Sequence, residues 1–307
     1  MNGLGYVLLL LATLGWSFVG ILVKIASGMA DSMLITFARF GFGVLFLGGW
    51  LLLKGGKIRL SAALPWIWIG AAGKSLNYFF ENTALKWGYS YGNIVIPPIQ
   101  MIALLLFSVF LLKERIGPRG WTASALCLAG ILLIGWGNAG GEFAEGASWL
   151  TTLFFALAGV GASIHVLSQR SLVKEMDAAT MNFIVFFWAS VMTAAPLPFA
   201  GDPLPGGFSI AALAAMIALG LITGLSFLAF AEAIKRVPFP AVIIISNCQV
   251  LFQLIWSAAL FSEPITLRII AGALLFTTSI VLMNMPLRRR VVIRDGGAAA
   301  GTGRVEG

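Results

Sequence analysis

Long apolar runs recur along the chain, and short polar turns separate them. Ten runs are long enough for membrane helices, at residues 3–24, 32–53, 64–85, 90–112, 119–137, 148–170, 178–199, 209–233, 239–261 and 266–286. A helix needs about 20 mostly apolar residues to cross a hydrocarbon core of roughly 30 Å. Segments between the runs, such as KGGKIRLS and GDPLPGG, are rich in turn-forming residues. The pattern predicts an all-α integral membrane protein with ten transmembrane helices.

The composition supports this prediction, because 59% of the 307 residues are hydrophobic and only 10% are charged. A soluble domain needs more polar surface than this to cover itself. The two cysteines, Cys127 and Cys248, lie in apolar runs, and the chain has one histidine. We therefore interpret the cysteines as packing residues and expect neither a metal site nor a cofactor. The run at 3–24 lacks a basic leading segment, so we interpret it as the first span, not as a signal peptide.

The distribution of lysine and arginine predicts which end of each span faces the cytoplasm. If the N-terminus lies inside, 15 of the 20 basic residues fall in cytoplasmic segments, as the positive-inside rule requires. This gives an N-in, C-in orientation with a basic cytoplasmic tail at 288–307, which we expect to be disordered. Topology and anionic membrane lipid then explain the net charge of +8. No nucleic-acid partner is expected.

Two distant segments of the chain resemble each other. Residues 84–119 and 233–268 align without a gap at an offset of 149, with 11 of 36 positions identical. Apolar bias does not explain the matching charged and amide residues, which are Lys86/Lys235, Gln100/Gln249, Glu114/Glu263 and Arg119/Arg268. Five spans separate the copies, and since five is odd, the second copy is predicted to be inverted. We expect one five-helix repeat at 1–143 and an inverted one at 144–287, an arrangement typical of secondary transporters.

The two glutamates of the repeat, Glu114 and Glu263, end equivalent spans at opposite membrane faces. Because they are equivalent, we interpret them as structural latches near the loops.

Several motifs carry a family resemblance. They are WSFVGILVK in the first span, Arg39-Phe40 in the second, ENTALKWGYSYGN and LLKERI across the third and fourth, and AEAIKRVPFPAV and FSEPIT across the eighth and ninth. With these motifs the chain resembles the EamA family of the drug/metabolite transporter superfamily, over about residues 3–286. The resemblance implies a ten-helix, two-fold pseudosymmetric carrier that usually exports small metabolites such as amino acids.

The chain departs from the family pattern in the ninth span. Family members typically keep a proline in the middle of this span. Here Ser246, Asn247 and Cys248 stand where the fourth span has Pro97, Pro98 and Ile99. Equal hinging of the two halves is therefore not expected.

Lys74 lies near the middle of the third apolar run. A cation at the centre of a membrane helix costs about 2.5–3.5 kcal/mol, so intramembrane charges are functional by default. Lys74, Tyr78 and Glu81 are spaced i, i+4 and i+7 on one helix face, with Asn77 beside them. We predict that Lys74 faces a water-accessible cavity and binds a carboxylate or another anion of the solute, while Tyr78 stacks on its organic part. The alternative is a neutral or internally paired lysine that pins one conformation.

Further residues at similar depth are candidates for solute binding. They are Trp16 and Ser17 in the first span, Gln100 in the fourth, and Asn247, Gln249, Gln253 and Trp256 in the ninth. Polar side chains at this depth should face protein or water, so they either bind the solute or hold helices together. In the repeat, Thr223 takes the place of Lys74. Only one half carries the charge, which suits a single asymmetric ligand.

Six residues are candidates for coupling or gating: Arg39, Glu81, Pro97, Pro98, His165 and Glu232. The two carboxylates, near opposite membrane faces, are candidates for the site of a coupling proton. The arginine either guards the outer mouth or pairs with Glu81. The histidine is either a proton relay or a helix–helix contact. The proline pair is expected to break backbone hydrogen bonds within the fourth span, as in the discontinuous helices that line transporter sites.

These features predict a secondary transporter in the inner membrane of a bacterium. We expect it to export a small organic solute, an amino acid or a related carboxylate, by alternating access. The proton is the candidate coupling ion, and membrane lipid is expected to surround the protein. A monomer and a homodimer both remain open. The chain has no phosphate loop and no H-E-x-x-H or Ser/His/Asp grouping, which argues against ATP-driven pumping and hydrolysis. The alternatives are a non-transporting membrane receptor or scaffold, and a membrane enzyme, for which only Glu81 and Glu232 offer a catalytic pair.

Overall fold

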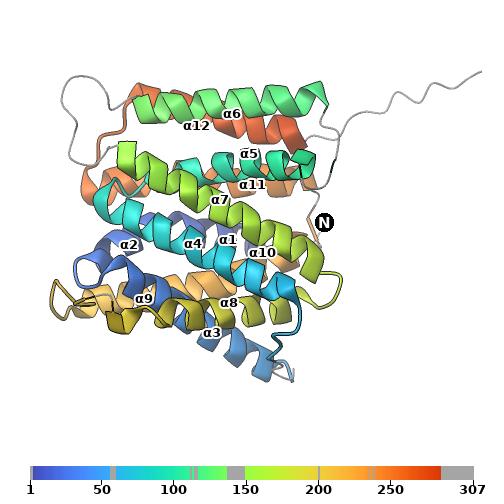
Figure 1. Ribbon diagram of the computed structural model, residues 1–307. Helices are drawn as coiled ribbons and strands as arrows, with labels where there is room; N and C mark the ends of the chain where they lie inside the picture. The colour runs from blue at the N-terminus through green and yellow to red at the C-terminus, as the bar shows by residue number, and fades with distance from the viewer. Residues whose placement is uncertain are drawn as a thin grey trace, which may run out of the picture.

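The computed structural model is a bundle of helices that run along one common direction (Figure 1). It describes residues 3–55, 60–110, 113, 117–136, 149–199, 201–234, 236–237 and 239–284. In chain order the helices are α1 (Gly3–Ser17), α2 (Val19–Ser27), α3 (Ser32–Leu53), α4 (Pro65–Trp87), η1 (Gly92–Val95), α5 (Ile96–Phe110), α6 (Pro118–Trp136), α7 (Trp149–Leu172), α8 (Ala178–Ala194), η2 (Leu197–Phe199), α9 (Ile210–Leu221), η3 (Ile222–Ser226), α10 (Phe227–Ile234), α11 (Phe239–Phe261) and α12 (Leu267–Asn284). Within the described residues they form ten helical segments, one for each predicted span, so the all-helical prediction is confirmed. The tail at 288–307 and Glu114 lie outside the described residues.

Five of the described segments are long and apolar enough to cross a membrane. They are Gly3–Ser27, Ser32–Leu53, Trp149–Leu172, Ala178–Phe199 and Ile210–Phe230. The outer surface is apolar as well: Leu45 is 68% exposed and Leu274 is 57% exposed. Arg39 and Lys74, by contrast, are only 4% and 7% exposed. Charges inside and leucines outside are the distribution expected when lipid surrounds the bundle.

Four of the described segments are not regular α-helices along their whole length, and one of them is the seventh, Ala178–Phe199, which ends in the 3₁₀ turn η2. The first span is divided at Phe18 into α1 and α2, and the eighth contains a π-helical turn, η3, between α9 and α10. The fourth span starts with a 3₁₀ turn, η1, and α5 begins at Ile96. Pro97 and Pro98, which the sequence places at a mid-helix break, thus lie in the first turn of α5. There the missing N–H of proline leaves no intrahelical hydrogen bond unmade.

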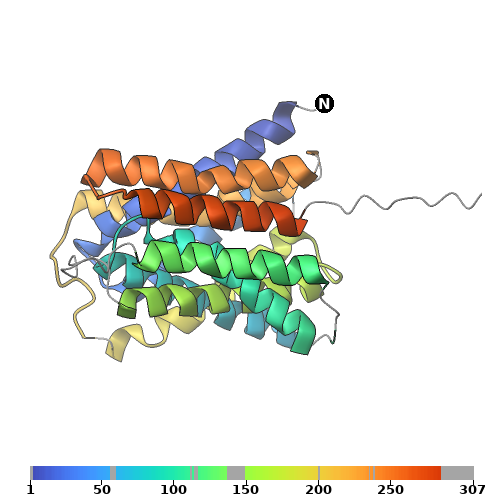
Figure 2. The same cartoon turned by 90° about the horizontal axis from the view of Figure 1, so that it is seen from above.

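The packing of the helices pairs segments from the two halves of the chain. α4 packs against α7 and α8, while α9, η3 and α10 pack against α1, α2 and α3. In Figure 1, α4 runs from right to left and the α9–η3–α10 segment from left to right. Seen from above, α12 lies beside both α11 and α6 (Figure 2). Helices that are distant in sequence therefore build the centre of the bundle together.

The crossing of α4 with α7 depends on two glycines. A Cβ added at Gly73 would lie 2.9 Å from the carbonyl oxygen of Gly161, and one added at Gly161 would lie 2.7 Å from the backbone nitrogen of Asn77. Larger residues would therefore push the helices apart, as expected where small residues allow membrane helices to approach closely. This crossing holds Lys74 and Asn77 against the second half of the chain.

Candidate functional site

A polar cavity of about 170 Å³ lies at the centre of the bundle. Its walls come from α1, α2, α3, α4, η1, α5, α7, α10 and α11, through Trp16, Val19, Arg39, Lys74, Asn77, Tyr78, Glu81, Asn93, Ile96, Pro97, Gln100, Ala162, Phe227 and Gln249. Both halves of the chain contribute to these walls. A cavity between two halves is where secondary transporters bind their solutes.

Lys74 brings a positive charge to this cavity. Its Nζ donates a hydrogen bond to Asn77 Oδ1 at 3.0 Å and lies 4.3 Å from the centre of the Tyr78 ring and 5.1 Å from that of Phe227. Asn77 is itself held by its Nδ2, which donates to the carbonyl oxygen of Ala158 on α7 at 3.0 Å. An ammonium group carries three donors. In the described part of the chain, no carboxylate forms a salt bridge with Lys74.

Arg39, the other basic residue of the cavity, is held by several partners. Its Nη1 donates to Glu81 Oε2 at 3.1 Å and to Asn82 Oδ1 at 3.3 Å, and its Nε donates to Thr223 Oγ1 at 3.2 Å. The guanidinium also lies 3.6 Å from the centre of the Tyr78 ring. The Arg39–Glu81 pair is therefore internally neutralised. Of the two basic residues that line the cavity, Lys74 is the one without a salt-bridge partner among the described residues.

Three aromatic residues and an asparagine complete the site. Tyr78 stacks on Phe40 with ring centroids 4.9 Å apart, and Trp16 meets Phe227 edge to face at 5.4 Å. Asn93 donates from Nδ2 to Glu81 Oε1 at 3.2 Å, whereas its buried Oδ1 has no hydrogen-bond partner in the described part of the chain. The site thus combines an unpaired cation, apolar walls and a free acceptor.

The structure places the residues predicted from sequence in three groups. Nine line the cavity: Trp16, Arg39, Lys74, Asn77, Tyr78, Glu81, Pro97, Gln100 and Gln249. Six others lie elsewhere: Ser17, Pro98, His165, Glu232, Gln253 and Trp256. Asn247 belongs to α11, but its side chain is outside the described residues.

Most residues outside the cavity have partners of their own. Trp256 Nε1 donates to Ser17 Oγ at 3.1 Å, and Glu232 pairs with Arg236 at 3.1 Å on a partly exposed surface. His165 Nδ1 lies 3.2 Å from the Gly70 carbonyl oxygen, at the crossing of α4 with α7. This position matches the helix–helix contact that was one of its two interpretations.

Sequence reasoning missed several residues of the site. Asn93, Phe227 and Ala162 line the cavity without having been singled out, and Asn82 and Thr223 hold Arg39. The repeat alignment could have pointed to Thr223, because this residue is the counterpart of Lys74. Its contact with an arginine of the other half could not be read from that correspondence.

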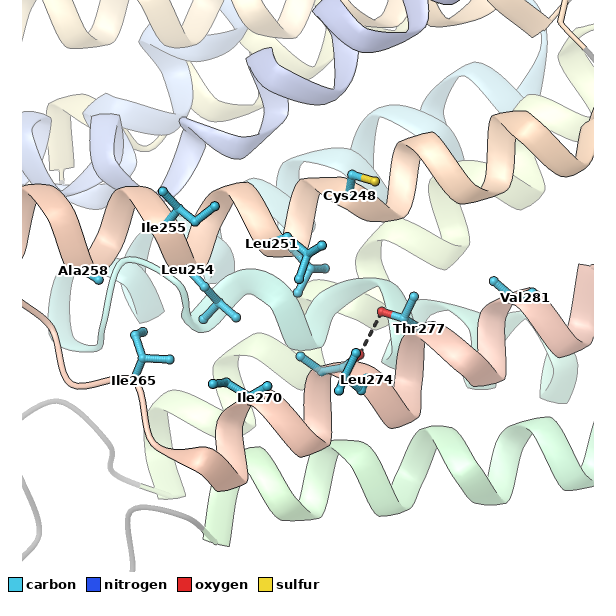
Figure 3. A pocket seen from close by; sticks show the side chains of 12 residues that line it. Cys248, Leu251, Leu254, Ile255, Ala258, Ile265, Ile270, Leu274, Thr277 and Val281 are labelled. Carbon is cyan, nitrogen blue, oxygen red and sulfur yellow. Dashed lines mark hydrogen bonds between the residues drawn. The ribbon is translucent and has the colours of Figure 1, made fainter.

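A larger but different hollow lies between α11 and α12. It measures about 620 Å³ and is lined by Cys248, Val250, Leu251, Leu254, Ile255, Ala258, Ile265, Ile270, Ala273, Leu274, Thr277 and Val281. Figure 3 shows side chains of α11 and α12 around this hollow, together with Ile265 from the connection between the two helices; the hydroxyl of Thr277 donates to the Ala273 carbonyl oxygen at 2.8 Å. Selective binding of a small polar solute requires a few convergent polar groups. The smaller central cavity has them, so we take it as the candidate solute site.

A metal centre is not indicated in the described part of the chain, since no three His, Cys, Asp or Glu residues there are grouped to hold a metal ion.

Comparison with known proteins gives one family. A model described as the EamA-like transporter family matches residues 3–136 and again residues 149–285. The chain is 24% identical over 264 residues to the uncharacterized inner membrane transporter YhbE of Escherichia coli K12, covering 83% of this chain and 80% of YhbE. It is also 24% identical over 289 residues to the pseudopaline exporter CntI of Pseudomonas aeruginosa PAO1, covering 91% of this chain and 95% of CntI.

A solved crystal structure shares the fold. It superimposes with a TM-score of 0.64 at 19% sequence identity and covers 91% of this chain and 97% of its own. At that identity the likeness concerns the fold alone.

Proposed function

Because the chain belongs to the EamA-like transporter family, a family of transporters and not of enzymes, we propose that this inner-membrane transporter exports a small organic carboxylate, such as an amino acid. The observation that carries the proposal is the uncompensated ammonium group of Lys74 in the central cavity. The site assignment below is proposed on the same ground.

The charge balance of the cavity favours an anionic group on the solute. Of its two cations, Arg39 is paired with the carboxylate of Glu81, which leaves one positive charge on Lys74. A carboxylate about 4 Å from Lys74 would gain about 4 kcal/mol in an environment with an effective dielectric constant of 20. That gain is as large as the cost of about 2.5–3.5 kcal/mol of placing a lysine at the centre of a membrane. The solute would thus stabilise the charge that recognises it.

The rest of the cavity favours a small solute with an apolar part. Its volume of about 170 Å³ is below the 300–1,000 Å³ typical of pockets for drug-sized ligands. Trp16, Tyr78 and Phe227 offer ring surfaces beside Lys74. Gln100 and Gln249, from equivalent positions of the two halves, offer amide groups. An amino acid with an apolar side chain would meet each of these surfaces.

Export by alternating access is the mechanism that we propose. The two family matches, the paired packing of the halves and the opposite directions of α4 and α9–η3–α10 support two inverted repeats, at 1–143 and 144–287. Basic loops support an N-in, C-in orientation. The description of CntI as an exporter supports the outward direction. Among the described lining residues Glu81 is the carboxylate, so it is our candidate for the site of a coupling proton.

A binding experiment tests the assignment of Lys74. Purified wild type and Lys74→Met are compared in detergent by thermal shift, against amino acids, other organic acids and uncharged analogues. We expect a carboxylate compound to raise the unfolding temperature of the wild type by several degrees and to leave Lys74→Met unchanged. Lys86→Met is the matched control, because it removes a lysine from the same helix without touching the cavity.

The outcomes separate the alternatives. If Lys74→Met and wild type respond alike, Lys74 is not the solute ligand. If a carboxylate binds but proteoliposomes loaded with it show no flux, the receptor alternative replaces solute export.

A further inference from the structure

Glu263 joins two distant parts of the chain at one end of the bundle. Its carboxylate accepts hydrogen bonds from the Ser90 N–H at 2.9 Å, from the Ser90 hydroxyl at 2.8 Å and from the Ser257 hydroxyl. Beside it, the hydroxyl of Tyr91 donates to the Pro264 carbonyl at 3.4 Å. We call the Glu263–Ser90 contact the latch. It ties the connection between α4 and α5 in the first half to the connection between α11 and α12 in the second.

The backbone is shaped to make this contact. Ser262 has a φ of 52°, a left-handed conformation that non-glycine residues rarely adopt. Lys113, its counterpart at the repeat offset of 149, has a φ of 53°. On the other side of the latch, a Cβ added at Gly20 would lie 1.8 Å from the Ser90 carbonyl oxygen, so α2 supports Ser90 directly. Strained backbone that recurs at matching places is typical of functional sites.

A buried amide without partners lies between the latch and the cavity. Gln253 is 3% exposed, and neither its Nε2 nor its Oε1 has a hydrogen-bond partner among the residues that the structure describes. Gln249, Gln253 and Ser257 are spaced i, i+4 and i+8, so they follow one face of α11. Gln249 lines the cavity and Ser257 donates to Glu263, so this polar stripe connects the two. An unpaired buried amide is unfavourable and calls for a conformation in which water or a ligand satisfies it.

We infer that the latch is the gate at one end of the solute path, and that the path runs from the cavity along Gln249, Gln253 and Ser257. The inference rests on the proposed transport function. With the latch closed, the two halves are held together at this end and the amide of Gln253 stays dry. With the latch released, water and solute reach it. Glu263 is thus a positioning residue that controls access to the cavity without being a ligand of the solute.

Cysteine accessibility tests the gate. The reporter is Gln253→Cys in a background in which Cys127 and Cys248 are replaced by alanine. Right-side-out and inside-out vesicles are treated with a membrane-impermeant cationic methanethiosulfonate reagent, and the labelling rate is measured with and without Glu263→Ala. Loss of a charge-assisted hydrogen bond shifts the balance toward the open state by about tenfold or more. We therefore expect labelling of Gln253→Cys to become about tenfold faster from one side of the membrane.

Two controls distinguish opening of the gate from general loosening. Ala189→Cys, whose parent side chain is fully buried in α8, reports unfolding and should remain protected when Glu263→Ala is introduced. Asp202→Ala removes a carboxylate from an exposed turn, where it accepts a hydrogen bond from the Leu204 N–H at 2.9 Å, and should leave the labelling of Gln253→Cys unchanged. The inference is overturned if Gln253→Cys is labelled at the same rate with and without Glu263→Ala. It is also overturned if Glu263→Ala accelerates the labelling of Gln253→Cys and Ala189→Cys equally. The labelling experiment needs no solute. A failure of carboxylate binding would therefore leave the gate untouched, and a failure of the gate would leave the proposal of carboxylate binding untouched.

Discussion

α4 and the α9–η3–α10 segment take matching places in the two halves of the bundle, yet only α4 brings charge to the cavity. At the repeat offset, Lys74 corresponds to Thr223 and Glu81 to Phe230. α4 is a continuous helix, whereas the other segment has its π-helical turn, Ile222–Ser226, where Lys74 would be matched. These two segments therefore line the cavity unequally, as the proposed asymmetric solute would require.

The α9–η3–α10 segment brings no charge to the cavity, but it still makes specific contacts there. Thr223, in the π-helical turn, accepts the hydrogen bond of Arg39 Nε and lies 3.4 Å from the hydroxyl of Tyr78. π-Helical turns are frequent at functional sites, because they change where the side chains of one turn point. In the proposed mechanism, α4 would supply the cation for the solute, while Thr223 would help to hold the neighbouring side chains of Arg39 and Tyr78 in place.

The largest loss of stability should follow when the Arg39–Glu81 ion pair is broken. Glu81→Leu leaves Arg39 buried and unpaired, so we expect a loss of about 3–5 kcal/mol of stability. Phe230→Leu, at the counterpart position, should lose less, because it removes only part of a ring that packs against Trp16. Thermal unfolding of the purified variants measures both. The double variant Arg39→Leu/Glu81→Leu should recover part of the stability lost in Glu81→Leu. If Glu81→Leu and Phe230→Leu destabilise the protein equally, the proposed difference between α4 and the α9–η3–α10 segment does not exist.

An intermediate effect is expected at the two helix crossings that flank the cavity. A Cβ at Gly161 would lie 2.7 Å from backbone atoms of Asn77 and Gly73, whereas one at Gly15 would lie 2.5 Å from the hydroxyl of Ser226. A hydroxyl can rotate away, but backbone cannot. Gly161→Ala should therefore destabilise by about 1–3 kcal/mol and Gly15→Ala by less. If unfolding midpoints fall equally, the α4–α7 crossing is no tighter than the α1–η3 crossing.

The smallest loss of stability should come from a substitution in the α9–η3–α10 segment. Thr223→Val keeps the shape but removes an acceptor, so we expect a loss of about 1 kcal/mol, because Arg39 retains Glu81 and Asn82 as partners. Thr223→Ser keeps the hydroxyl and is the control. Unfolding midpoints should rank wild type and the serine variant above the valine variant. A valine variant as stable as the wild type would show that the π-helical turn does not help to hold Arg39.

The site was partly readable from the sequence. The spacing of Lys74, Tyr78 and Glu81 placed these residues on one helix face, and all three line the cavity. Gln100 and Gln249 were found through the repeat. Where the position along a helix decides which way a side chain points, periodicity is sufficient.

Other features could not be read from the sequence. Neither the break at Phe18 nor the π-helical turn has a proline or a turn motif to mark it. Pro97 and Pro98 do mark a helix boundary, but they begin α5 instead of interrupting it. Apolar periodicity shows where a span lies, but not how its backbone adapts to its neighbours.

The sequence by itself determined the ten helical segments, the membrane as their solvent and the presence of a buried cation, because hydropathy and helical spacing are local properties of the chain. Only the tertiary structure decided which charge is paired. Arg39 meets Glu81 42 residues away and Thr223 184 residues away, and Glu263 meets Ser90 173 residues away. These contacts depend on which helices cross and how closely their backbones approach. That is why Arg39, and not Lys74, has a carboxylate partner among the described residues.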